Sequence, residues 1–152
     1  MNVQEFLDSK KVKFQILSHE PTYDAQRMAQ AVDVPGRDVA KTVLLRGGEN
    51  QYIVAVLPAP EHVDLAKAAT VLGQAKVELA TEIEMGEHCP DCETGALPPF
   101  GSQYGMQTLL DESLAAHKEL VFESNTHAES IRMSVRDFQE LEKPTVGRFI
   151  LA

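Results

Sequence analysis

An α+β fold in a single domain is the class that the sequence predicts, and three observations support it. Short apolar strand patterns are mixed with short helix patterns, without the regular strand–helix alternation of a parallel α/β sheet. Residues typical of turns and helix caps separate these patterns. The chain of 152 residues can bury one real core and has no internal repeat or low-complexity linker. We therefore expect one domain over residues 1–152, with a small mixed or barrel-like sheet and surrounding helices.

The first part of the chain predicts a helix, a strand and a second helix. Asn2 and Glu5 form a capping box in front of a helix over residues 3–10. Apolar and polar residues then alternate over residues 12–16, as in a half-buried strand. After a loop, Asp24 caps a second helix with one apolar face.

A β-hairpin is the clearest local signal. Two apolar runs, over residues 42–45 and 51–57, flank a polar turn led by glycine at residues 47–50. The second run is apolar on both faces, so we expect a central strand. Lys41 stands at the entrance of the first strand.

The remaining elements are predicted from the same signals, because caps begin helices, glycine or proline ends them, and apolar patterns mark strands. In chain order they are a helix over 64–72 ended by Gly73, a strand over 76–79, a short helix boxed by Thr81 and Glu84 that ends before Gly86, strands over 107–110, 120–123 and 130–133, and a last helix boxed by Ser134 and Asp137 that Pro144 stops.

Residues 95–101, with the sequence Gly-Ala-Leu-Pro-Pro-Phe-Gly, do not fit a regular helix or strand. The two prolines fix φ and remove two backbone donors, and Phe100 can pin the loop to a core. The glycine at each end leaves peptide N–H groups that can receive a ligand oxygen or carboxylate. The same composition also suits a rigid connector between two elements, so both interpretations stay open.

The chain is acidic, with 14 Lys and Arg against 23 Asp and Glu and a formal charge of −9. A surface that wraps nucleic acid needs clustered cations, so DNA is not expected as a partner. The longest apolar run, over residues 53–57, is far shorter than a membrane span, so no membrane partner is expected either. The first residues lack the order of an export signal, and two cysteines make no disulfide framework. Both observations favour the cytoplasm.

Two side chains are candidates for chemistry. Lys41 is either a solvated strand end or a cation at a pocket rim that holds a phosphate or orients a carbonyl. His127, in a polar turn between two predicted strands, is either a surface residue or a general base near neutral pH. His19, His62 and His117 have no clear partners in the sequence and are interpreted as surface residues.

The sequence His88-Cys89-Pro90-Asp91-Cys92 contains a single Cys-x-x-Cys. His88, Cys89 and Cys92 offer at most a three-ligand metal site, because no second cysteine pair follows. A redox pair is equally weak, because no strand-then-helix context follows. We therefore favour an ordered start of the loop and expect no metal and no cofactor. The motifs of covalent nucleophiles are also absent, so any chemistry would depend on positioned water, substrate groups and backbone donors.

Three segments, at residues 39–44, 95–101 and 125–131, resemble the YbaK family in order and separation. They read Val-Ala-Lys-Thr-Val-Leu, Gly-Ala-Leu-Pro-Pro-Phe-Gly and Asn-Thr-His-x-x-x-Ile. This family comprises aminoacyl-tRNA deacylases related to the editing domain inserted in bacterial prolyl-tRNA synthetases. The resemblance covers essentially the whole chain.

The resemblance implies a freestanding trans-editing enzyme with a mixed six-stranded barrel and peripheral helices. Such enzymes hydrolyse the ester of a mischarged tRNA, using water or a ribose hydroxyl of the substrate. The resemblance also implies that Lys41 positions the tRNA end and that Gly101 presents its backbone to the substrate carbonyl. The further residues that we expect to contact substrate are Gly95, Pro99, Phe100, Asn125 and His127. The acceptor end of aminoacyl-tRNA is the implied partner, with an aminoacyl-tRNA synthetase as a second candidate.

Some features depart from the family pattern and keep alternatives open. Asp24-Ala25 stands where the family often has Thr-Ala, and relatives that edit prolyl-tRNA commonly carry other residues at positions 127 and 129. The alternative function is a module of the same fold that binds a tRNA end or a synthetase with weak or no hydrolysis. A small metal protein that uses His88, Cys89 and Cys92 is a third candidate.

Overall fold

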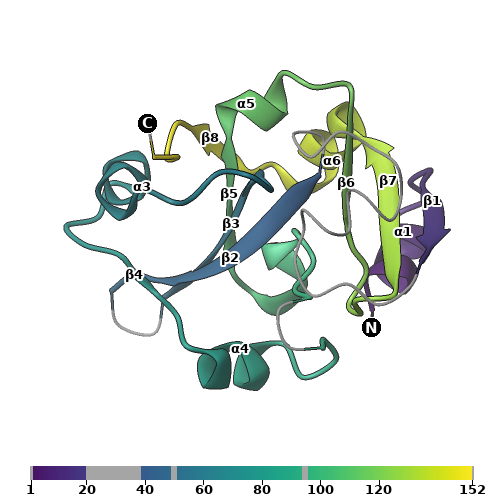
Figure 1. Cartoon of the computed structure of the whole chain (residues 1–152), viewed down its shortest axis with the longest axis horizontal. Coiled ribbons are helices and arrows are strands. Elements are labelled where there is room, and N and C mark those ends of the chain that lie inside the picture. Colours follow the sequence, from purple (N-terminus) through teal and green to yellow (C-terminus); the bar gives the residue numbers. More distant parts are fainter. Residues whose placement is uncertain (1, 20–38, 49–50, 94–95, 152) are drawn as a thin grey trace.

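The structure, a computed structural model, describes residues 2–19, 39–48, 51–93 and 96–151 (Figure 1). The predicted helix that begins at Asp24 and part of the hairpin turn lie outside the described residues. The elements in chain order are α1 (Val3–Ser9), β1 (Gln15–Ser18), β2 (Ala40–Arg46), β3 (Tyr52–Pro58), α3 (Leu65–Leu72), β4 (Glu78–Leu79), α4 (Glu82–His88), the 3-10 helix η2 (Gly101–Tyr104), β5 (Gln107–Asp111), α5 (Glu112–Ala115), β6 (Glu119–Glu123), β7 (Glu129–Ser134), α6 (Val135–Glu142) and β8 (Thr145–Gly147).

The strands form two sheets. One has the order β4-β2-β3-β5-β8 and is mixed, because β3 pairs antiparallel with β2 and parallel with β5. The other is antiparallel, with the order β1-β7-β6. An isolated parallel bridge between Val39 and Val121 joins them. The expected α+β fold with a mixed sheet is confirmed, although the strands divide into sheets of five and three rather than one of six.

Strand β3 lies in the middle of the five-stranded sheet, as its apolar sequence predicts. Val54 and Val56 belong to one buried cluster, which also contains Phe100. Ile53 and Ala55 belong to a second cluster on the other face. Successive side chains of a strand point to opposite faces, so a strand with a core on each side must be apolar throughout. Figure 1 shows α3 on one side of the molecule and α1 with β1 on the other.

The predicted helix caps are in place. The side chains of Asn2, Thr81 and Ser134 each accept a hydrogen bond from a backbone N–H in the first turn of α1, α4 or α6. Asp64 does the same for α3, which ends at Gly73 in the left-handed conformation. Among the described residues, no helix is long and apolar enough to cross a membrane.

The structure differs from the predicted elements at several places. Strand β1 begins later than predicted, and Ile16 is 49% exposed because this edge strand reaches beyond the core. Helix α4 continues through Gly86. Of the strand expected over 76–79, only β4 forms. The sequence patterns did not predict η2, α5 or β8.

Glu84 connects α4 to the first hairpin. Its carboxylate accepts a hydrogen bond from the Tyr52 hydroxyl at 2.6 Å and lies 3.4 Å from an Arg46 nitrogen. The Tyr52 hydrogen bond is the largest cause that lowers the pKa of Glu84 from 4.5 to about 2, followed by the backbone of Thr81. Because the folded pKa lies below the unfolded one, this stabilisation is present above about pH 4.5 and is lost as the pH falls toward 2.

We expect Tyr52→Phe to lower the free energy of unfolding near pH 7 and to matter less in acid. Removing the hydroxyl takes away the strongest partner of the Glu84 carboxylate, and that partner counts most while the carboxylate is ionised. Urea unfolding of both proteins between pH 7 and 2 measures the difference. A difference that stays constant over this range would contradict the assignment.

Candidate functional site

The loop that follows Gly95 is packed into the core rather than laid over the surface. Residues 96–100 are all buried. The ring of Phe100 lies 5.2 Å from that of Phe138 and 5.3 Å from that of Phe6, measured between centroids. This confirms Phe100 as the side chain that pins the loop. Direct contact of Pro99 or Phe100 with substrate stays a prediction that their burial does not favour.

Gly101, at the end of this loop, is held tightly against β5. Its N–H donates to the Thr108 hydroxyl at 2.9 Å, and its carbonyl accepts from Met106 N–H at 2.9 Å. A Cβ at this position would lie 2.7 Å from the Thr108 hydroxyl oxygen, 2.9 Å from the Met106 carbonyl oxygen and 3.1 Å from that of Gln107. The structure thus explains the glycine by packing. Its expected contact with a substrate carbonyl stays a prediction, because its N–H already has a partner.

The carboxylate of Glu142, the last residue of α6, also holds the region around Gly101. Thr108 donates its hydroxyl proton to Glu142, which also accepts from the Ser102 N–H at 3.0 Å and the Ser102 hydroxyl at 2.5 Å. The chain of contacts from Gly101 through Thr108 to Glu142 fixes the start of η2. Sequence reasoning missed this network. The available signal is Thr108, a polar residue next to the apolar Leu109 and Leu110.

Lys41 lies near the start of β2 and is half-buried. Its neighbour Thr42 donates to the Leu97 carbonyl, so the Thr42 side chain faces the loop. Alternation along a strand puts Lys41 on the other face, with Val43. Burial lowers the pKa of the Lys41 ammonium, and the nearby Glu61 carboxylate raises it by a smaller amount. The partial burial of Lys41 argues against the interpretation of a fully solvated strand end. Strand alternation, however, directs its side chain away from the loop that contains Leu97.

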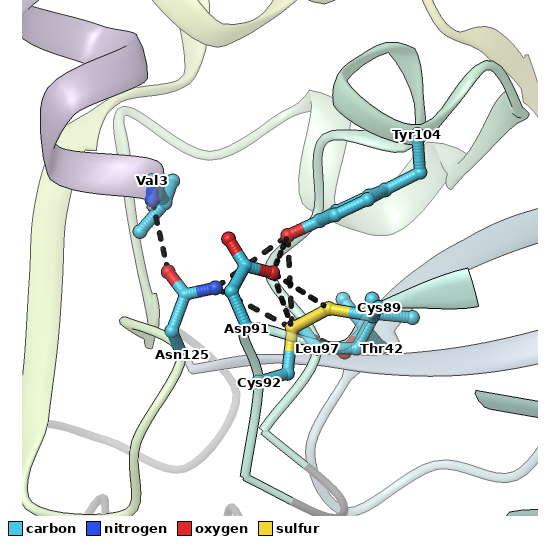
Figure 2. The surroundings of a disulfide bond; sticks show 8 residues. All are labelled: Val3, Thr42, Cys89, Asp91, Cys92, Leu97, Tyr104 and Asn125. Carbon is cyan, nitrogen blue, oxygen red and sulfur yellow. Dashed lines mark hydrogen bonds between the residues drawn. A yellow bond between two sulfur atoms is a disulfide. The ribbon is translucent and has the colours of Figure 1, made fainter. Parts of the chain in front are cut away.

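Asn125, in the turn between β6 and β7, joins three segments. Its backbone is in the left-handed region with φ of 63°. Its side-chain oxygen accepts from Val3 N–H at 2.9 Å, and its carbonyl accepts from Glu93 N–H at 2.7 Å. Its side-chain nitrogen lies 3.4 Å from Cys92 Sγ and 3.5 Å from the Tyr104 hydroxyl. The amide that we expected to contact substrate is therefore engaged inside the protein (Figure 2).

His127 is 4% exposed, so it is not the surface residue that one interpretation allowed. Its Nδ1 lies 2.9 Å from a carboxylate oxygen of Glu123, on the neighbouring strand β6. A carboxylate this close to one ring nitrogen can fix the orientation of the ring, and a positioned histidine is a candidate general base. Glu129, in the same turn region, accepts from the Gln4 side chain of α1 at 2.9 Å.

The structure corrects the interpretation of the two cysteines. Cys89 and Cys92 are joined by a disulfide, although the sequence context argued against a redox pair. Cys89 is the C-cap of α4, so the pair follows a helix and lacks the strand-then-helix context, as the sequence indicated. His88 packs its ring 4.2 Å from that of Tyr52. Within the described part of the chain, the side chains of Cys89, Asp91 and Cys92, and not that of His88, are grouped closely enough to hold a metal ion.

The structure brings the loop and Asn125 together, whereas Lys41 stands apart from them. Figure 2 shows Asn125 beside the cysteines and Tyr104, and Leu97 beside Thr42. Gly101 and Tyr104 are the two ends of η2, so the loop and the turn between β6 and β7 meet here. Lys41 stands on the opposite face of β2, and Gly95 lies outside the described residues.

Known proteins resemble this chain over almost its whole length. The family model described as aminoacyl-tRNA editing domain matches residues 19–141. The multifunctional Ser/Thr-tRNA deacylase ProXp-y of Escherichia coli (strain K12) is 23% identical over 147 residues, which are 94% of this chain and 87% of the relative.

Two crystal structures have the same fold. That of a candidate trans-editing enzyme for prolyl tRNA synthetase superposes with a TM-score of 0.87 at 22% identity, over 99% of this chain and 95% of the other. That of the hypothetical protein APE2540 superposes with a TM-score of 0.89 at 18% identity, over 98% and 99%. The family model spans Lys41, the loop and the turn between β6 and β7, which confirms the resemblance to the YbaK family. The chain therefore belongs to the family of aminoacyl-tRNA editing domains.

Proposed function

We propose that this protein is a trans-editing aminoacyl-tRNA deacylase, which hydrolyses the ester between a wrongly attached amino acid and the tRNA end. The observation that carries the proposal is the family match over residues 19–141, which includes all three segments noted in the sequence. The E. coli relative is named for Ser- and Thr-tRNA, so we place serine and threonine first among the candidate amino acids.

The mechanism that we propose needs no enzyme nucleophile. Ester hydrolysis develops negative charge on the carbonyl oxygen and requires a positioned water or ribose hydroxyl. We assign the Lys41 ammonium to hold the terminal phosphate or ribose and so fix the geometry of attack. The His127–Glu123 pair is the base that we assign to the attacking hydroxyl.

The charge of −9 limits how the tRNA is held. A protein with few cations makes few phosphate contacts, so the proposed contact is confined to the acceptor end. An aminoacyl-tRNA synthetase that delivers the tRNA is the second partner that we propose.

A binding module of the same fold is the second candidate function. Two observations favour it: the Gly101 N–H donates to Thr108, and strand alternation directs Lys41 away from the loop that Thr42 contacts. In such a module the fold would bind a tRNA end or a synthetase without turnover.

Deacylation of purified Ser-, Thr-, Ala-, Cys- and Pro-tRNA by the protein, with and without synthetase, separates these functions. Hydrolysis of one or a few species supports the deacylase. No hydrolysis of any species, together with retained binding to uncharged tRNA, supports the module.

Lys41→Met tests the proposed role of the cation. Methionine keeps the apolar stem and removes the charge, so we expect kcat/KM to fall about 100-fold with an unchanged melting temperature. Lys67→Met is the matched control, because Lys67 is also half-buried and its ammonium donates to the Ile150 carbonyl at 3.2 Å. Deacylation unchanged in Lys41→Met, or lost equally in both variants, would remove Lys41 from the mechanism.

A further inference from the structure

Cys89 and Cys92 lie at the end of α4, beside the side chains of Asn125 and Tyr104 (Figure 2). Cys89 is 2% exposed, whereas Cys92 is half-buried and more accessible. Cys92 Sγ lies 3.4 Å from the Asn125 side-chain nitrogen and 3.6 Å from the Tyr104 hydroxyl. An incoming thiolate can therefore reach Cys92 more readily than Cys89.

The surroundings of the sulfur atoms disfavour negative charge. A carboxylate oxygen of Asp91 lies 3.5 Å from Cys89 Sγ and 3.8 Å from Cys92 Sγ. Cys89 also stands at the C-terminal end of α4, which carries the partial negative charge of the helix. Since a thiolate at either cysteine would be repelled, these groups slow both the attack of an incoming thiolate and the departure of the leaving one.

We infer that Cys89 and Cys92 form a reversible dithiol–disulfide site whose state sets how firmly η2, from Gly101 to Tyr104, is held. In the reduction step, a thiolate of a dithiol reductant attacks Cys92 Sγ, the protein S–S bond breaks, and Cys89 leaves as a thiolate that takes a proton. The second thiol of the reductant then displaces Cys92, so the protein gains two electrons and two protons and the reductant becomes a disulfide. Oxidation by a small disulfide such as oxidised glutathione is the reverse exchange.

The contacts of Cys92 couple this chemistry to the loop. Two thiol sulfur atoms cannot remain at bonding distance, so reduction displaces Cys92 Sγ relative to Asn125 and Tyr104. Asn125 also holds Glu93 N–H, and Tyr104 donates to Asp91 at 3.1 Å from the end of η2. Reduction is therefore expected to loosen two contacts, that of Glu93 N–H with Asn125 and that of Tyr104 with Asp91. Any effect on deacylation rests on the proposed function, but the thiol chemistry does not.

Thiol titration of the native protein tests the site directly. After exposure to oxidised glutathione and removal of the reagent, the denatured protein should show no free thiol, and after dithiothreitol it should show two. Asp91→Asn should speed reduction at least about fivefold, because it removes one negative charge about 4 Å from the attacked sulfur. Two free thiols after oxidation, or stoichiometric zinc that protects both thiols, would overturn the proposal.

Stability and hydrogen exchange test the coupling without any tRNA. The oxidised protein should melt about 4–8 °C above the reduced one, and amide exchange over residues 101–104 should be slower. The double variant Cys89→Ser/Cys92→Ser should match the reduced protein and ignore oxidant. If a disulfide forms but exchange in this segment equals that of the double variant, the coupling is wrong. These outcomes do not depend on whether the protein hydrolyses aminoacyl-tRNA.

Discussion

Replacing Gly101 with alanine is expected to lower the free energy of unfolding by about 3 kcal/mol. The added Cβ would lie 2.9 Å from the Met106 carbonyl oxygen and 3.1 Å from that of Gln107. Both are backbone atoms of the segment that leads into β5, so they cannot rotate away as a side chain could. Relief requires the loop to move off β5, which breaks the hydrogen bond from Gly101 N–H to Thr108. A buried N–H without a partner adds to the cost of the overlap.

Gly86→Ala is the matched control for this measurement. A Cβ at Gly86 meets nothing within 4 Å, and the residue lies inside α4. Alanine in a helix is more favourable than glycine, so this variant should be as stable as the parent or slightly more stable. Urea unfolding of the three proteins gives both differences. Parental stability of Gly101→Ala would contradict the packing explanation and leave the substrate contact that the family resemblance implies.

Replacing Asn125 with alanine is also expected to cost about 3 kcal/mol of stability. The substitution leaves the Val3 N–H without its acceptor in a buried position. It also puts a residue with a Cβ and no compensating side-chain bond into a backbone with φ of 63°. Both effects act on the folded state, and they add to the loss of the contact with Cys92.

Asn125→Gly separates the two contributions. Glycine tolerates the left-handed backbone but lacks the side-chain oxygen, so it should be more stable than Asn125→Ala by about 1 kcal/mol and less stable than the parent. The unfolding free energies of all three proteins check this order. Equal stability of the glycine variant and the parent would show that the bond to Val3 contributes nothing.

Local signals in the sequence predicted much of the fold. The caps at Asn2 and Ser134 lie within three residues of the N–H groups that they accept from, so the sequence contains both partners of each bond. The hairpin of β2 and β3 is likewise local. Strand β8 was missed because its three residues become a strand only by pairing with β5, from which they are separated by α5, β6, β7 and α6.

The site was harder to predict because its contacts are distant in sequence. The glycine at position 101 suggested bare backbone for a ligand, but it is crowded by Met106 and by the first two residues of β5, which η2 turns back against it. The partner of Thr108 is Glu142, which no local pattern connects to it. The pairing of the cysteines and their contact with Asp91 were local, but the contacts with Tyr104 and Asn125 are made only by the fold.

The attachment of α1 to the turn between β6 and β7 affects how the chain folds during synthesis. Val3 bonds to Asn125 and Gln4 to Glu129, across separations of 122 and 125 residues. The ribosome makes α1 first, but its docking partners appear only when most of the chain has left the exit tunnel. Non-local contacts of this kind slow folding, so the apolar face of α1 remains without its docking partners during most of translation.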